Sequence, residues 1–357
     1  MLYLCRAKQT KDIAQTRKSP MKRHIFVYFT LLMSLHAVAD EPQTPPQRDR
    51  FKEFWGRVDK WLCDRYYNVS VDTNYIARPQ TRWTVTVPYN LTGATVYTRG
   101  TMGGEEMRMR SAYKCKNTIG LAGSYTGISL ALTYNPSSFF GWYNDLEYNT
   151  TEYYNRMGFD FVVHRAKNVR GWTQVGDGPK TEIGKKNISQ RSFNFNYYYA
   201  FNYKKFSYPA AFCQSYIQKR SAGSFMLGAS FQWQKLHSAG DATIGNEVVK
   251  LKAANIGIGA GYGYNFVIRK NWLLHLSTLP TFIVYSRARL WTGDGIQTMP
   301  YHFPEFIMTG SAALIRNFGR YFAGGTMHIN YTLIGRREQL QVGNSKWRTH
   351  FFIGFRF

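Results

Sequence analysis

Histidine has the widest catalytic use of any side chain, and its placement in this sequence argues against a metalloenzyme. Beyond residue 39 the histidines are His164, His237, His275, His302, His328 and His350. None has a second histidine three or four residues away, the spacing that places two imidazoles on one helix face to bind zinc. The sequence also contains no GxSxG motif and no P-loop. We therefore assign no catalytic, cofactor-binding or metal-binding residues, and we expect no cofactor.

Two of these histidines are expected to face the interior of the protein. His275 and His328 share a face with small polar residues in two segments of alternating pattern, 271–287 and 320–334. A serine–histidine mechanism requires a hydroxyl within about 3 Å of the imidazole. Residue order alone does not reveal such a contact, so a hydrolase or acyltransferase stays open as an alternative function.

A second stretch with chemical character is residues 206–224, FSYPAAFCQSYIQKRSAGS. It combines aromatic side chains, a proline that restricts the backbone, hydrogen-bonding side chains and two basic residues. The candidate gating or docking residues are Ser207, Tyr208, Pro209, Phe212, Gln214, Tyr216, Lys219 and Arg220. We predict that this segment folds into or across one mouth of the structure that carries it, near a helix over Arg50–Arg65. The alternative is a plain surface loop.

The elements that position these residues are β-strands, because after Pro79 the apolar residues recur at every second position. In 193–203 every odd position is aromatic, and in 255–265 a row of glycines and asparagines opposes an apolar row. We predict about twelve strands over 83–98, 106–123, 127–135, 146–154, 157–167, 190–204, 223–237, 249–267, 271–287, 305–317, 320–334 and 346–357.

The connections between these strands alternate between short and long, which is typical of a bacterial outer-membrane barrel. The fold class predicted is therefore all-β, an antiparallel transmembrane β-barrel of about twelve strands with an N-terminal amphipathic helix. The segment 206–224 lies on the side of the short turns, which is the periplasmic side, although it is much longer than a turn needs to be. The longest connection on the other side is expected over residues 168–189.

The sequence HFFIGFRF (350–357) forms the last predicted strand. Phe351, Ile353, Phe355 and Phe357 share one face, which we expect to contact acyl chains. A terminal aromatic residue on such a strand resembles the C-terminal signal that barrel-assembly machinery recognises. We therefore assign these four residues to barrel assembly and lipid contact.

The N-terminal part has the pattern of an exported protein. Residues 21–39 combine a basic start, a short apolar core and a small-residue cleavage site, which predicts a cleaved signal peptide; residues 1–20 are interpreted as a mis-start extension. Residues 40–80 are predicted to hold a periplasmic linker and the amphipathic helix Arg50–Arg65, which either packs on the barrel or lies in the membrane interface. Residues 81–357 form the predicted barrel.

The charge of the chain restricts the class of molecule that it can bind. Without residues 1–39 the chain keeps 39 basic and 20 acidic residues. Since export argues against nucleic acid as a partner, this surplus of positive charge favours outer-membrane lipids, including anionic lipopolysaccharide.

The three remaining cysteines form no CxxC motif, and Cys63 and Cys213 are either bridged or free.

Several long motifs resemble one uncharacterised family, domain of unknown function 4421. They are VDTNYIARPQTRWTVTV (71–87), NRMGFDF (155–161), KKFSYPAAFCQSYIQKRSAGSFMLGASF (204–231), GYGYNFVIRKNWLLHLSTLP (261–280) and NFGRYFAG (317–324). The resemblance covers almost all of 50–357 and implies an exported Gram-negative barrel without assigned catalytic residues. The sequence thus predicts a porin-like pore, transport or structural protein; the alternatives are an outer-membrane lipid-modifying enzyme and a protein of surface adhesion or assembly.

Overall fold

The structure is a computed structural model of the 357-residue chain. It describes residues 50–102, 105–113, 115–126, 128–136, 146–166, 169–183, 188–238, 250–269, 271–292, 295–299, 301, 303–336 and 340–357. The predicted extension, signal peptide and first part of the linker lie outside these residues. The chain divides into two units, Met1–Val58 and Asp59–Phe357.

The predicted amphipathic helix is present as α2 (Arg50–Tyr67), two residues longer than expected. Its residues from Asp59 onward belong to the second unit. Trp61 is 57% exposed, so the apolar side of the helix is only partly covered. Among the described residues, no helix is both long enough and apolar enough to cross a membrane.

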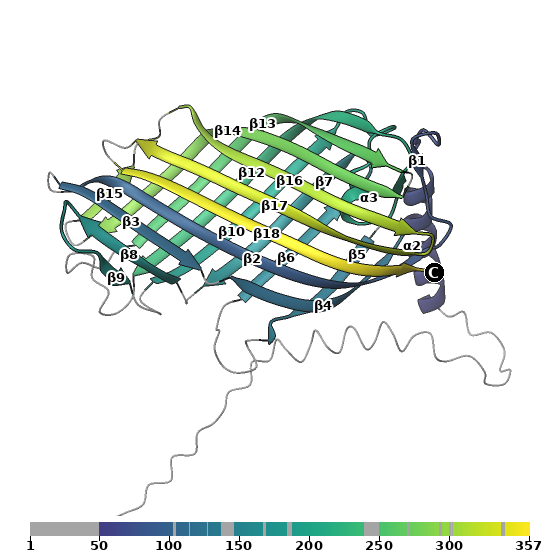
Figure 1. Cartoon of the computed structure of the whole chain (residues 1–357), viewed down its shortest axis with the longest axis horizontal. Helices are drawn as coiled ribbons and strands as arrows, with labels where there is room; N and C mark the ends of the chain where they lie inside the picture. Colours follow the sequence, from purple (N-terminus) through teal and green to yellow (C-terminus); the bar gives the residue numbers. More distant parts are fainter. Residues whose placement is uncertain are drawn as a thin grey trace, which may run out of the picture. The chain divides into compact units, whose positions relative to one another are not determined.

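The second unit is built on one sixteen-stranded sheet in which every pair is antiparallel (Figure 1). Its strands are β2 (Trp83–Met102), β3 (Glu105–Tyr113), β4 (Lys116–Tyr125), β5 (Ile128–Tyr134), β6 (Leu146–Tyr153), β7 (Met157–Ala166), β8 (Val169–Val175), β9 (Thr181–Ile183), β10 (Ile188–Ala200), β12 (Ala222–Ser238), β13 (Lys250–Ile268), β14 (Trp272–Thr292), β15 (Gly295–Met299), β16 (Glu305–Phe318), β17 (Tyr321–Arg336) and β18 (Leu340–Arg356). The all-β, antiparallel barrel fold predicted from the alternation is therefore confirmed.

The pairing order follows one path along the curled sheet, and within the described residues its end strands, β6 and β9, do not pair with each other. From β6 it passes through β7, β10, β12, β13, β14, β16, β17 and β18 to β2, β3, β8 and β9. β18 pairs with β2 along its length, so the last predicted strand joins the first. The strand β8 follows β7 in the chain and pairs with β3, which brings the sheet back toward its beginning.

Three regions differ from the sequence-based expectation, so the sheet has sixteen strands rather than about twelve. The predicted connection 288–304 contains the end of β14 and the strand β15, which pairs with β14. The predicted strand 106–123 is divided into β3 and β4, which pair with the second and first halves of the long strand β2. The predicted connection 168–189 contains β8 and β9, because the edge of β3 offers unpaired backbone groups that a continuation of β7 can satisfy. Alternation predicted most of the strand-forming segments, but it missed β8, β9 and β15 and did not give the neighbour of each strand.

The prediction of long connections on one side of the barrel is wrong for two of them, because β3 begins at Glu105 soon after β2 ends at Met102, and β18 begins at Leu340 soon after β17 ends at Arg336. The turns at 154–156 and 319–320 are short, as predicted, and lie at the same end as the C-terminus. That end also holds the short strand β1 (Ile76–Ala77) and the short helix α3 (Tyr208–Phe212), whereas β3, β9 and β15 extend to the opposite end (Figure 1).

The two faces of the sheet differ as the alternation requires. Large apolar side chains such as Phe231 and Ile256 are exposed on the outside, whereas Asn265, His275 and Thr326 are buried on the inside. The interior row of glycines permits close packing, because a Cβ at Gly259 would lie 2.1 Å from the backbone oxygen of Pro280. The barrel therefore has an apolar exterior and a polar, tightly packed interior.

Candidate functional site

The segment between β10 and β12 folds into a structured element, here called the plug (residues 206–220). Its centre is α3, which begins after Ser207; the Ser207 hydroxyl accepts a hydrogen bond from the Ala210 amide at 3.2 Å. Pro209 stands in the first helical turn, where its missing N–H costs nothing. Residues Ile217–Gln218 form the two-residue strand β11. The expectation of a structured segment is met, with a helix and a strand that periodicity did not predict.

The plug lies within the curve of the sheet. The helix α3 contacts β14, β16 and β6, and five strands separate β6 from β16 in the pairing order. Phe206, Ser207 and Ala211 are fully buried. Gly263 provides space for the Phe206 ring, because a Cβ there would lie 3.1 Å from it. The plug thus occupies the mouth on the side of the short turns.

Aromatic rings join the plug to the barrel wall. The rings of Tyr208 and Phe212 stack on Tyr153 of β6, with centroids 5.4 and 5.1 Å away. Phe212 also lies 4.9 Å from the imidazole of His328 on β17, and Tyr208 lies 4.9 Å from His275 on β14. Both histidines therefore face inward, as their positions in the alternation predicted.

A hydrogen-bonded chain runs through the same contact. The His275 ring lies 2.7 Å from Asn265 Oδ1 through Nδ1, and 2.9 Å from Ser277 Oγ through Nε2. Tyr208 OH is 2.9 Å from the same Ser277 oxygen, and Asn265 Nδ2 donates to the Ser207 carbonyl at 2.9 Å. The structure therefore contains a serine–histidine contact, between Ser277 and His275. The second nitrogen of the imidazole faces the amide of Asn265 and not a carboxylate, and the plug covers the serine–histidine pair.

Gln218 is the polar centre of the plug. Its Oε1 accepts from the Ser207 amide at 3.0 Å and from Asn265 Nδ2 at 2.9 Å. Its Nε2 donates to the carbonyls of Lys205 and Arg220 at 2.6 and 2.9 Å. With only 3% of its surface exposed, this side chain replaces the water that these groups would otherwise bind.

A short segment before the barrel covers the plug. Ile76 and Ala77 of β1 pair with β11, and the Lys219 amide donates to the Tyr75 carbonyl at 2.7 Å. Lys219 Nζ donates to the Thr73 carbonyl at 2.8 Å. Lys219 and Arg220 themselves are exposed, so the covered plug presents positive charge to solvent.

Arg356, one residue before the chain end, anchors the plug from the inner face of β18. Its Nε donates to the Gln214 carbonyl at 3.2 Å and its Nη2 to Asn317 Oδ1 at 3.0 Å. The guanidinium also lies 4.4 Å from the Phe322 ring centroid, and the residue is only 2% exposed. Alternation places Arg356 on the face opposite to Phe355 and Phe357, but nothing in the pattern connects it with the plug.

The last turn of α2 also contacts the plug. Tyr66 OH donates to the Ser215 carbonyl at 2.5 Å, and its ring lies 5.2 Å from that of Tyr216. Burial raises the pKa of both phenols, so both stay protonated at neutral pH. Burial likewise raises the pKa of the Cys213 thiol; Cys213 and Cys63 are both free. The expected proximity of helix and plug is therefore observed.

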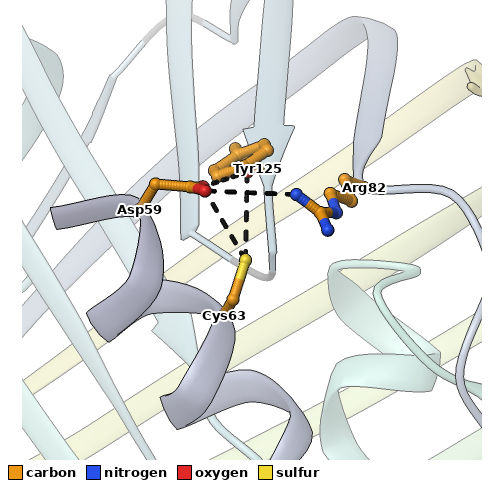
Figure 2. A network of polar contacts seen from close by, with 4 residues as sticks. All are labelled: Asp59, Cys63, Arg82 and Tyr125. Carbon is orange, nitrogen blue, oxygen red and sulfur yellow. Dashed lines mark hydrogen bonds and ion pairs between the residues drawn. The ribbon is translucent and has the colours of Figure 1, made fainter. Parts of the chain in front are cut away.

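A polar network attaches the same helix to the rim of the barrel (Figure 2). Tyr125 OH at the end of β4 donates to the Asp59 carboxylate, and Arg82 lies 4.0 Å from that carboxylate. Cys63 Sγ lies 3.7 Å from Asp59 Oδ1 and 3.9 Å from Tyr125 OH. The exposed ion pair adds little stability by itself, but together these contacts hold the part of α2 from Asp59 onward at the plugged mouth.

The C-terminal stripe lies on the outer face of β18. Phe351, Ile353 and Phe357 are about half exposed or more, and Phe355 is partly covered by Tyr321, whose ring is 4.9 Å away. Phe357 also exchanges two backbone hydrogen bonds of 3.0 Å with Trp83. The predicted faces are correct; the role of the stripe in assembly stays a prediction.

Above the plug, small cavities in the barrel are lined mainly by polar side chains. One is bordered by Asp160, Asn196, Ser277 and Ser311, and another by Gln190, Ser192, Gln232 and Asn344. Within the described ranges, no group of three or more His, Cys, Asp or Glu side chains is placed to hold a metal ion. These small cavities can hold water, and the plug lies between them and the mouth on the side of the short turns.

Comparisons with known proteins place these features in context. The family described as Domain of unknown function (DUF4421) matches residues 70–357. No curated protein matches the sequence. Among solved structures, the outer membrane protease OmpT from Escherichia coli is similar with 8% identity and a TM-score of 0.45, over 78% of this chain and 97% of that chain. The outer membrane protein OprG from Pseudomonas aeruginosa is similar with 10% identity and a TM-score of 0.28, over 80% of this chain and 99% of that chain.

Proposed function

The chain belongs to the family described as Domain of unknown function (DUF4421), and we propose that it is an outer-membrane β-barrel that acts as a gated pore. In this proposal the plug closes the periplasmic mouth, and its displacement opens a polar lumen. The observation that carries the proposal is the double attachment of the plug, through stacked rings to β6 and through Asn265, His275 and Arg356 to β13, β14 and β18.

The proposed location is supported by the sequence and by the barrel exterior. The predicted signal peptide directs export, and the exterior of the sheet presents exposed aromatic and aliphatic side chains that suit acyl chains. The barrel-assembly machinery is the partner proposed for the C-terminal stripe. The plug also offers a docking face for a periplasmic partner, because Lys219 and Arg220 are exposed on it.

A gate requires attachments that can be broken one at a time. Hydrogen bonds to a charged group contribute about 1.5–3 kcal/mol each, and Arg356 holds the Gln214 carbonyl by one such bond. Arg356→Gln is therefore expected to raise the ratio of open to closed channels by about tenfold or more. Single-channel recording on refolded protein in planar bilayers measures this ratio directly.

The matched control is Arg320→Gln, because Arg320 is an exposed arginine in the turn before β17. It removes the same charge at the same rim without touching the plug side chains. An unchanged open fraction in Arg356→Gln, or a parent protein that is permanently open, contradicts the gated-pore proposal.

The alternative function, a lipid-modifying enzyme, is favoured by one observation, the contact between Ser277 and His275. A nucleophilic serine must reach its substrate, yet Ser277 also bonds Tyr208 and the imidazole is fully buried. We therefore expect Ser277→Ala to leave phospholipid hydrolysis in mixed micelles at the background level of the parent. Hydrolysis by the parent that disappears in Ser277→Ala establishes the enzyme instead.

A further inference from the structure

Five cationic side chains form a continuous row across five neighbouring strands. In β7, β10, β12, β13 and β14 the row is Arg165, Arg191, Lys235, Lys252 and Arg289. Each is the direct partner of the next in the register of the sheet. Since neighbouring strands lie about 4.8 Å apart, the row is roughly 19 Å long. Nothing in the sequence indicates this row, because its members are far apart in the chain.

The row lies on the outside of the barrel, close to the mouth opposite the plug. Arg191 is on the same face of β10 as Phe195, and Lys235 on the same face of β12 as Phe231, and both aromatic residues are exposed. Arg191 is near the start of β10, whereas the plug follows its end. In the proposed orientation this level corresponds to the outer leaflet.

Such a row is unfavourable without counter-charges. Like charges directly opposite one another destabilise a pair of strands, and this row contains four such pairs in succession. Within the part of the chain that the structure describes, no carboxylate forms an ion pair with a member of the row. The aromatic ring of Trp291 is 5.2 Å from Lys252 Nζ and supplies only a weak attraction.

The surface below the row is apolar. Four residues further along each strand, toward the plug, lie Phe161, Phe195, Phe231, Ile256 and Tyr285, again in direct register. A ligand that satisfies both levels has anionic groups spread over a wide head and several acyl chains beneath it. We propose that the row binds the phosphate groups of lipopolysaccharide in the outer leaflet. This inference rests on the proposed outer-membrane location but does not depend on gating.

The proposal is tested by neutralising three consecutive positions of the row, in the variant Lys235→Gln/Lys252→Gln/Arg289→Gln. A cation near anionic head groups contributes about a fivefold gain in affinity, so we expect about 100-fold weaker binding of lipopolysaccharide. Binding is measured by calorimetry on refolded protein in uncharged detergent micelles, and the difference in gel mobility between boiled and unboiled samples verifies folding.

The matched control is Arg269→Gln/Arg316→Gln/Arg320→Gln, three exposed arginines at the plug end of the barrel. It changes the net charge equally and should alter affinity less than threefold. Dephosphorylated lipopolysaccharide should bind the parent about as weakly as lipopolysaccharide binds the neutralised row. Equal losses in both triple variants, tight binding of the dephosphorylated lipid, or saturation of the row by millimolar inorganic phosphate alone overturns the proposal.

A second measurement separates binding from a structural role. Without lipid, the row variant should melt at the same temperature as the parent or higher, because the repulsion between like charges has been removed. Lipopolysaccharide should raise the melting temperature of the parent and not of the variant. A variant that melts clearly below the parent in lipid-free detergent shows that the cations stabilise the barrel themselves, which contradicts the inference.

Discussion

Replacement of residues 207–220 by a short Gly-Ser turn is expected to convert a mostly closed channel into one that conducts continuously. The plug buries Tyr208 and Tyr216 and contributes the aromatic contacts with Tyr153 and His275. Burial of each large apolar side chain contributes roughly 1.5–3 kcal/mol. Because several such side chains are removed together, the closed state loses most of what favours it. Planar-bilayer conductance of the refolded variant measures the result.

The control for this variant changes the opposite mouth. Residues 177–180 lie in the turn between β8 and β9 and are remote from the plug in the chain and in the sheet. Their replacement by Gly and Ser should leave conductance unchanged. If barrels that assemble with the shortened plug conduct like the parent, the plug has no gating role and the pore proposal fails.

The second large effect is expected from a charge on the lipid-facing stripe. Phe351 is five residues from the end of β18, which places it about 12 Å below the rim in a tilted strand and close to the middle of a layer about 30 Å thick. Phe351→Arg should therefore lower the free energy of unfolding by roughly 2–4 kcal/mol and reduce the amount of protein in the outer membrane. Urea titration of the barrel refolded in vesicles measures the free energy.

A matched substitution at the rim separates the effect of depth in the membrane from the effect of the introduced charge itself. Tyr321 is the first residue of β17, faces outward and is 62% exposed. Tyr321→Arg introduces the same charge in place of an aromatic residue and should cost only about 0–1 kcal/mol. Equal losses in the two variants would contradict either the outward face of Phe351 or its depth in lipid.

The strands were predictable because their evidence is local. Alternation has a period of two residues, so the faces of 193–203 and of 350–357 follow from the pleat of a single strand. The amphipathic spacing in Arg50–Arg65 likewise identified α2 to within two residues. The alternation did not indicate that residues 106–123 divide into two strands, because that division depends on which strands lie beside them.

The site was predictable only in part. The length and aromatic content of 206–224 indicated a structured plug, and His275 was correctly placed on the inner face. Ser277 lies two residues after His275 on the same strand, whereas Asn265 and the anchor Arg356 come from two other strands, so their contacts depend on register and on the curvature of the sheet. The sequence of a strand indicates on which face of the sheet a side chain lies, but not which residue it contacts across the lumen.

The cationic row shows the same limit most clearly. From the sequence, Arg191, Lys235 and Lys252 are three basic residues among many, and their composition indicates only an attraction to anionic lipid. The pattern of each strand determined that these residues face outward, because the pleat is a local property. Only the tertiary structure decided that they lie at one level, since register is set by pairing between segments distant in the chain and a shift of two residues would keep the face but break the row.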